Sequence, residues 1–176
     1  MVILGLGSNV GDRLMYLRQA LKCLQQHADI KVCQVSPVYE SDAMLPPNAP
    51  NSWHLPFFNA AVACTTTLLP YAMLKALQEI ELQLGRDQQH QHWGPRTIDF
   101  DILYWPGVAI NSETLTIPHK GLYERPFALW PLIDVYSDWD YPRDILHEWN
   151  SRFTGNAPFG TRQVTYRIDD SIVGEE

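Results

Sequence analysis

Cysteine is scarce in this sequence, with three residues among 176, and none of them forms a CxxC pair. An odd number of cysteines without paired spacing argues against both a disulfide framework and a thiolate metal centre. Cys23 and Cys33 fall in apolar periodic segments, so we expect them to be small core residues. The cysteine content fits a reducing compartment, and we expect a cytoplasmic protein.

Long apolar runs and an excess of positive charge are also lacking. The N-terminal stretch MVILGLGSN is only briefly apolar and has no basic residue, so the sequence predicts neither a signal peptide nor a membrane span. Lys and Arg number 13 against 20 Asp and Glu, and the net charge of −7 argues against nucleic-acid binding. A local basic cleft or a bound metal ion would still allow an anionic ligand.

The first part of the chain alternates strand and helix patterns. The apolar run 2–7 ends in glycine and is typical of a buried strand. The next segment has a leucine every three or four residues, which predicts an amphipathic helix with Ser8 or Asn9 as its cap: Leu14, Leu17, Leu21 and Leu24. Apolar and β-branched residues over 29–41 predict a second strand.

The middle of the chain repeats this order. A strand is expected at 57–68, a helix from Pro70 to a glycine cap at Gly85, and a strand at 97–105. The order β-α-β-β-α-β predicts a ferredoxin-like core of the α+β class. Further short elements are expected around this core, with a strand at 113–119 and helices near 124–134 and 143–152.

The length fits a single domain, which we place at residues 1–153. Residues 154–176 change to Gly, Pro and acidic residues, and we expect a tail or linker with at most one short strand in RQVTYRI. Two long loops, 41–56 and 87–95, come before the strand at 97–105. Loops of this length in a compact domain usually carry function, so we expect them to act as lids.

Two carboxylates lie within the apolar strand 97–105. The alternation of side chains puts Asp99 and Asp101 on one face of it and Phe100 on the other. An isolated pair of this kind is more often a solvent-facing edge pair. The other interpretation is a magnesium site, because Mg²⁺ prefers carboxylate oxygens and keeps positions for phosphate and water. The preceding Trp93 and Arg96 favour the magnesium site. We expect the compensating charge to arrive largely with a magnesium nucleotide, and the pair to be the least stable part of the strand without it.

Basic residues lie near the ends of the elements that flank this strand. Arg86, Arg96 and Arg125 are each more often solvated surface charges, but an arginine fork matches phosphate oxygens. His119 follows a strand end and could donate to a phosphate oxygen, although a lone histidine is usually structural. Together with the carboxylates, these residues predict a nucleoside triphosphate site.

At this point the motifs resemble a known family. Residues 2–142 are similar to the 6-hydroxymethyl-7,8-dihydropterin pyrophosphokinases of folate biosynthesis, through the motifs GSN, FFNAAV, QEIELQLGR, WGPRTIDFDIL, LTIPH and RPFALWPL. The resemblance implies a ferredoxin-like enzyme that transfers the β,γ-pyrophosphoryl group of the co-substrate ATP to a dihydropterin and releases AMP. It also implies two Mg²⁺ ions and a family in which fusion to dihydropteroate synthase is a known arrangement.

The resemblance further implies roles for individual residues. The metal ligands would be Asp99 and Asp101, which with Arg86 and Arg96 would form the catalytic set. ATP contacts would come from Gln78, Glu81, Trp93, Arg96, Ile102, Thr116, His119 and Arg125. Pterin contacts would come from Ser41, Met44, Phe57, Asn59 and Phe127, with the two rings stacking and the amide reading the pterin edge. The sequence departs from the family pattern at Gln88 and Thr114, where arginine occurs in other members, and at Lys120, where an aromatic residue is usual.

Two alternatives remain at this point. A non-catalytic ferredoxin-like domain could keep a ligand cleft or serve in protein interaction. A nucleotide-sugar transferase could also use a DxD pair, but it would need a larger nucleotide-binding domain than this chain provides.

Overall fold

The computed structural model describes residues 1–86, 93–136 and 160–169. Its centre is a six-stranded sheet in which the described neighbours pair antiparallel. The strands follow one another across the sheet as β5 (Asp99–Tyr104), β1 (Val2–Ser8), β4 (Phe57–Thr66), β3 (Tyr39–Ser41) and β8 (Arg162–Gln163). A further strand, β2 (Ile30–Val35), pairs with the other half of β4.

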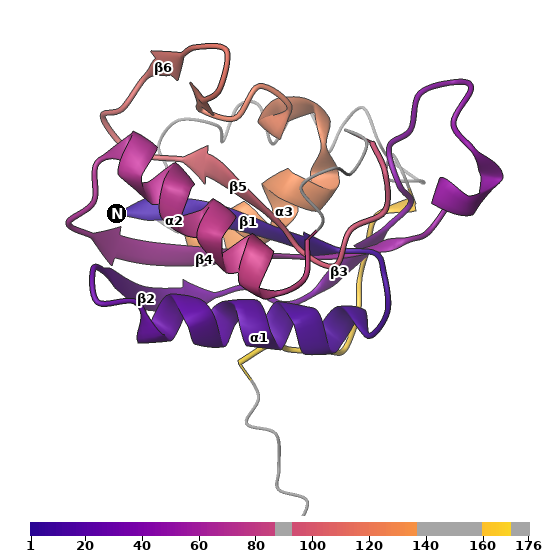
Figure 1. The fold of residues 1–176 in the computed structure, drawn as a ribbon, viewed down its shortest axis with the longest axis horizontal. Coiled ribbons are helices and arrows are strands. Elements are labelled where there is room, and N and C mark those ends of the chain that lie inside the picture. Colours follow the sequence, from indigo (N-terminus) through magenta and orange to yellow (C-terminus); the bar gives the residue numbers. More distant parts are fainter. Residues whose placement is uncertain (87–92, 137–159, 170–176) are drawn as a thin grey trace, which may run out of the picture.

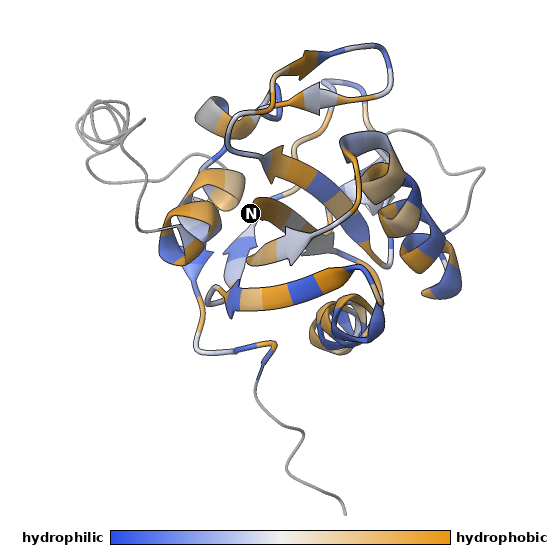
Figure 2. Ribbon diagram, turned by 90° about the vertical axis from the view of Figure 1, so that its left-hand side faces the viewer, coloured by the Kyte–Doolittle hydropathy of each residue, from blue (hydrophilic) through white to orange (hydrophobic). Residues whose placement is uncertain are grey.

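Within the described ranges, three α-helices cover the two faces of this sheet. Helices α1 (Arg13–Gln26) and α2 (Pro70–Gln83) lie on one face, and α3 (Pro126–Val135) lies on the other (Figures 1 and 2). The order of elements and the strand order β5-β1-β4-β3 confirm the predicted ferredoxin-like α+β fold. Because β1 lies in the middle, its alternate side chains are buried under both layers. Leu4 packs in the cluster beneath α1 and α2, and Ile3 packs in the cluster beneath α3.

The helix predictions hold in their positions but not in one cap. The predicted leucine stripe of α1 is buried at Leu17, Leu21 and Leu24. Its cap is Asp12, whose side chain accepts a hydrogen bond from the Met15 amide at 3.0 Å, so the expected caps Ser8 and Asn9 were wrong. Gly85 follows the last turn of α2 with a φ of +83°, the left-handed conformation that a glycine adopts at low cost after a helix.

The expected strand at 29–41 is two strands. Pro37 lies between β2 and β3 and has no amide hydrogen, so it cannot donate to a β-ladder. An irregularity between Val32 and Gln34 also breaks the register with β4. Cys33 lies at this irregularity and is exposed, which corrects its expected place in the core, while Cys23 is half-buried against the core.

The remaining described elements complete the fold. The expected strand at 113–119 is the second arm of a short hairpin formed by β6 (Ile110–Asn111) and β7 (Thr116–Ile117). The helix expected near 124–134 is α3, and the short strand expected in RQVTYRI is β8. The helix expected at 143–152 lies outside the described residues. Among the residues that the structure describes, no helix has both the length and the apolar character needed to cross a bilayer.

Candidate active site

Two hollows meet at the carboxylates of β5. The first, which we call the inner cavity, is lined by β1, β4, β5 and α3. The second, which we call the outer cleft, has a volume of about 450 Å³ and lies between α2, β5 and the segment that follows β7. Asp99 and Asp101 line both of them. The predicted same-face pair therefore lies where the two hollows meet.

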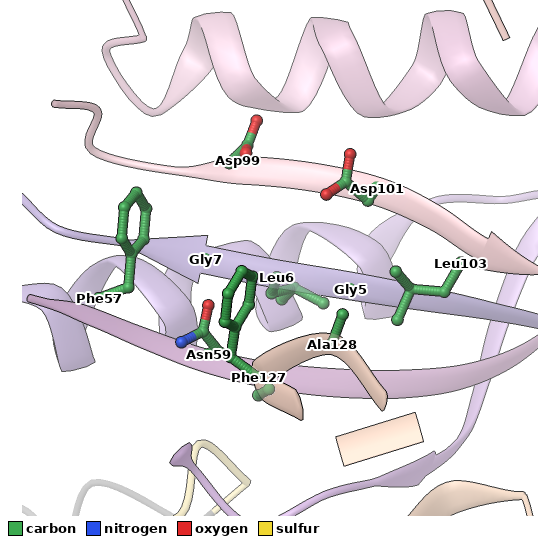
Figure 3. A pocket seen from close by; sticks show the side chains of 11 residues that line it. Gly5, Leu6, Gly7, Phe57, Asn59, Asp99, Asp101, Leu103, Phe127 and Ala128 are labelled. Carbon is green, nitrogen blue, oxygen red and sulfur yellow. The ribbon is translucent and has the colours of Figure 1, made fainter. Parts of the chain in front are cut away.

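The inner cavity has an aromatic pair and one amide. Phe57 and Asn59 come from β4 and Phe127 comes from α3, and in Figure 3 the amide lies between the two rings. Gly7 of β1 forms the floor beside them, where an added Cβ would lie 3.4 Å from the Phe57 ring and 3.5 Å from Asn59 Oδ1. These are ordinary van der Waals distances, so the ring and the amide lie directly over this part of β1.

The amide of Asn59 is oriented by β3. Its Nδ2 donates to Ser41 Oγ at 3.0 Å and lies 3.5 Å from the carbonyl oxygen of Tyr39. Both Asn59 and Ser41 are buried, with exposed fractions of 7% and 2%. Because the amide nitrogen is turned towards β3, Oδ1 is left on the side of Gly7 and the cavity. The arrangement presents an acceptor to a ligand that carries N–H donors.

Asp99 is compensated by two arginines of the protein itself. Its Oδ1 accepts a hydrogen bond from Arg86 Nη1 at 2.7 Å, and its Oδ2 lies 3.1 Å from Arg96 Nε. This corrects the expectation that the compensating charge for this residue arrives with a nucleotide. It also places two guanidinium groups, which match phosphate oxygens in geometry, beside the junction.

Of the two carboxylates, Asp101 has the less favourable surroundings for a negative charge. Its side chain is 43% exposed in the cleft, yet the surrounding protein reduces its hydration and raises its pKa, and the negative charge of Asp99 raises it further. The imidazole of His119 is its neighbour in the cleft, with Nε2 3.6 Å from Asp101 Oδ1. Binding of a divalent cation would lower the pKa of Asp101 again, because the positive charge favours the ionised form of both carboxylates.

The oxygen donors of this pair suit Mg²⁺. Within the described parts of the chain, no group of three or more His, Cys, Asp or Glu side chains is placed to hold a metal ion. Mg²⁺ is commonly held by one or two carboxylates, with water and substrate phosphates completing its shell. Asp99 and Asp101 therefore fit an ion that is shared with a phosphorylated ligand.

Glu81 joins α2 to β5 rather than standing free in the cleft. Its Oε1 accepts the Phe100 amide at 2.7 Å and also pairs with Arg86 Nη1. Its side chain is almost fully buried, and this burial raises its pKa to about 7 against the lowering effect of Arg86. Glu81 thus holds the Arg86 guanidinium beside Asp99, and it also holds the β5 backbone through the Phe100 amide.

The outer cleft gathers most of the residues predicted to contact a nucleotide. It is lined by polar, basic and aromatic side chains, which include Gln78, Glu81, Arg86, Trp93, Arg96, Thr114, His119, Lys120 and Arg125. The two remaining predicted residues, Ile102 and Thr116, line an adjoining groove that shares Asp101 and His119 with the cleft. Apolar Leu74 and Phe100 line both spaces, so a planar ring and a phosphate chain could be held side by side.

Some predicted residues lie apart from these spaces. Met44 is half-buried in the loop that precedes β4 and lines neither the inner cavity nor the outer cleft. Ser41 reaches the inner cavity only through Asn59. Gln88, and with it most of the loop expected to act as a second lid, lies outside the described residues.

Sequence reasoning missed the contribution of Asn9 to this site. Its Oδ1 accepts the Arg96 amide at 2.8 Å, and its Nδ2 donates to the carbonyl oxygen of Leu55 at 3.3 Å. Asn9 thus ties the end of the loop between β3 and β4 (residues 42–56, expected as 41–56) to the segment that carries Arg96. The GSN motif contains Asn9, but a role as helix cap accounted for an asparagine at this position equally well.

The fold and site define a nucleotide-dependent transferase of the ferredoxin-like α+β class, with a carboxylate pair between an aromatic cavity and a basic cleft. The family model for 7,8-dihydro-6-hydroxymethylpterin-pyrophosphokinase (HPPK) matches residues 3–137. The chain belongs to this family.

Relatives with known names agree with this assignment. The chain is 43% identical over 132 residues to a 2-amino-4-hydroxy-6-hydroxymethyldihydropteridine pyrophosphokinase of Bacillus subtilis, and the match covers 75% of each chain. It is 35% identical over 176 residues to a mitochondrial folate synthesis bifunctional protein of Pisum sativum, of which it spans 32%. Among solved structures, Plasmodium falciparum HPPK-DHPS with pterin and p-hydrobenzoate matches 92% of this chain and 47% of its own. That match has a TM-score of 0.62 at 14% identity and supports the fold alone.

Proposed function

We propose that this chain transfers the β,γ-diphosphoryl group of ATP to the hydroxymethyl group of 6-hydroxymethyl-7,8-dihydropterin and releases AMP. The observation that carries the proposal is the position of Asp99 and Asp101, which line the aromatic inner cavity and the basic outer cleft at once. A transfer between two bound substrates needs such a junction, because the acceptor oxygen and the phosphorus must be held in contact.

The inner cavity binds the pterin. Phe57 and Phe127 supply faces for stacking on a flat bicyclic ring, and Asn59 Oδ1 accepts from its N–H groups. The cavity holds about 50 Å³, which is less than such a ring requires. The two phenyl rings therefore move apart as the pterin enters, a change of side-chain position that is common at binding sites.

The outer cleft and its adjoining groove bind the nucleotide. The groove, with Leu74, Ile102 and Thr116, takes the adenine, and the cleft takes the phosphates. Two Mg²⁺ ions bound by Asp99 and Asp101 would neutralise the phosphate oxygens and polarise the transferred group.

The protein contributes position and charge rather than covalent chemistry. The hydroxymethyl oxygen attacks the β-phosphorus in line with the oxygen that leaves with AMP, and the hydroxyl proton passes to water. Arg86 and Arg96 already lie beside Asp99 at the junction, so a small movement brings either guanidinium to a phosphate oxygen. No side chain is required as a general base in this scheme, and closure of the 42–56 loop would keep water from the phosphorus.

Identification of the nucleotide product tests the proposal. The protein is incubated with Mg²⁺, ATP and 6-hydroxymethyl-7,8-dihydropterin, and we expect AMP and the diphosphorylated pterin in equal amounts. Formation of ADP would contradict the transfer of two phosphoryl groups. Binding of both substrates without turnover would favour the alternative of a non-catalytic ligand-binding domain.

Family members with longer chains suggest where the product goes. In Plasmodium falciparum HPPK-DHPS, a chain of the same fold family is part of a larger protein. We infer that a dihydropteroate synthase, fused or separate, consumes the pterin diphosphate. Coupled turnover on addition of such an enzyme and p-aminobenzoate tests this inference. The proposed setting is the cytoplasm, and the proposed pyrophosphokinase domain is 1–153, against which residues 160–169 pack through β8 and Ile168.

A further inference from the structure

Residues 160–169, which we call the C-terminal strap, extend the sheet beside the inner cavity. They lie beyond residues 3–137, which the family model matches. Within the strap, β8 pairs with β3, and the Val164 amide donates to the Val38 carbonyl oxygen at 2.9 Å (Figure 1, yellow). In return, the Val38 amide donates to the Tyr166 carbonyl oxygen at 3.3 Å. The strap is therefore a strand partner of β3.

Buried side chains hold the strap in place. Ile168 has an exposed fraction of 3% and belongs to the core cluster that α1 and α2 cover. The Tyr166 ring lies 5.7 Å from the Phe58 ring, and Arg18 Nη2 of α1 donates to the Arg167 carbonyl oxygen at 3.2 Å. Apolar burial and backbone bonds thus anchor the strap, and such contacts withstand salt better than surface ion pairs.

The strand that the strap supports is the one that orients Asn59. β3 has only three residues, and Ser41 at its end accepts the Asn59 amide hydrogen bond. Without the strap, β3 would be a free edge strand that leads directly into the 42–56 loop. A short edge strand with one partner opens readily, and each opening would release the Asn59 amide.

A series of ion pairs also links the strap to β3 and to the 42–56 loop. Glu40 of β3 lies between Arg162 of the strap, at 3.0 Å, and Arg13 of α1, at 3.3 Å. Arg13 also donates to the Pro56 carbonyl oxygen at 3.0 Å, and its Cζ lies 3.7 Å above the Phe58 ring. Arg162 therefore bonds to Glu40 near the start of the 42–56 loop and is linked through Glu40 and Arg13 to Pro56 at the end of the loop.

We infer that the C-terminal strap positions Asn59 for the pterin, so that Ile168 and Arg162 are positioning residues for recognition of the acceptor substrate. This inference rests on the proposed function. None of the strap residues lines the outer cleft. Loss of the strap should consequently weaken pterin binding and leave nucleotide binding unchanged.

The test compares two core truncations in the full-length chain. Ile168→Ala empties a buried position in the strap, and Ile30→Ala empties an equally buried position of the same cluster in β2, which has no contact with β3 in the pairing of the sheet. The KM values for 6-hydroxymethyl-7,8-dihydropterin and for Mg²⁺-ATP are measured for both variants. Hydrogen exchange at the Val38 amide reports opening of the strap.

We expect Ile168→Ala to raise the KM for the pterin about fivefold or more, the equivalent of one oriented hydrogen bond, with faster exchange at Val38. Its KM for Mg²⁺-ATP should stay within about twofold of the wild-type value, since no nucleotide contact changes. Ile30→Ala should lower the melting temperature comparably and leave both KM values unchanged.

A second variant covers the case in which Ile168→Ala does not fold. Val164→Pro removes the amide that bonds to Val38 without emptying the core, and it should give the same selective change in KM. An equal rise of both KM values, or fast exchange at Val38 with an unchanged pterin KM, would overturn the inference alone. A wild-type protein that neither binds nor converts the pterin would overturn the proposed function and the inference together.

Discussion

Two substitutions of Glu81 distinguish the contribution of its hydrogen bond to β5 from that of its ion pair with Arg86. Its Oε1 accepts the buried Phe100 amide and pairs with Arg86, which also holds Asp99. Glu81→Gln keeps an acceptor for the Phe100 amide and removes only the charge. Glu81→Ala removes both, and it leaves the Phe100 N–H unpaired inside the protein.

The expected changes in the free energy of unfolding follow from these contacts. An unpaired buried N–H costs about 1–3 kcal/mol. Loss of one of the two carboxylates around Arg86 adds little, because Asp99 still neutralises this arginine at 2.7 Å. We therefore expect Glu81→Ala to lower the free energy of unfolding by about 2–4 kcal/mol, with the missing side-chain volume included, and Glu81→Gln to lower it by less than about 1 kcal/mol.

Urea unfolding at pH 7, followed by tryptophan fluorescence and circular dichroism, measures both values. Equal destabilisation by the two variants would refute the assignment, because it would mean that the charge of Glu81 rather than its bond to β5 stabilises the fold. Turnover provides a further readout: Glu81→Gln should keep the β5 backbone in place and retain more activity than Glu81→Ala.

Three further predictions concern the carboxylates, the amide and the acid limit of stability. Asp101→Asn should reduce kcat more than about 100-fold without lowering the melting temperature, since burial and Asp99 already disfavour its charge; a lower melting temperature would indicate a structural role. Asn59→Ala should weaken pterin binding in a fluorescence titration and leave binding of Mg²⁺-ATP nearly unchanged, and an equal loss of both would count against the pterin assignment. Burial raises the pKa of Glu40, but hydrogen bonds from Arg162 and Arg13 outweigh it and lower the net pKa below the ordinary value. Stability from Glu40 is thus present above its unfolded pKa of about 4.5 and is lost as the pH falls through the lower folded value, so Glu40→Gln should flatten the acid limb of a pH–stability curve.

The local patterns of the sequence were sufficient to predict most helices and strands and the common face of Asp99 and Asp101. Strand alternation alone puts Asp99 and Asp101 on one face, and leucine spacing alone predicts α1, because both patterns depend on neighbours in the chain. The irregularity at Cys33 and the cap at Asp12 depend on small local differences in backbone geometry that several residues could satisfy equally well.

The partners of the site residues could not be predicted in this way. Arg86 reaches Asp99 because the end of α2 packs beside β5, and Asn9 reaches Arg96 across 87 positions of the sequence. These contacts arise only when the layers assemble, and no periodicity encodes them. The same holds for the strap, whose strand β8 meets β3 from the far end of the chain.

The product that carries the β-phosphorus of ATP distinguishes diphosphoryl transfer to the pterin from the alternatives. ATP labelled at the β-phosphorus is incubated with Mg²⁺, 6-hydroxymethyl-7,8-dihydropterin and the protein, and the products are separated. We expect the label to leave the nucleotide and to appear on the pterin, with unlabelled AMP in equal amount. Label that remains with ADP, or that appears as free phosphate, would contradict this expectation.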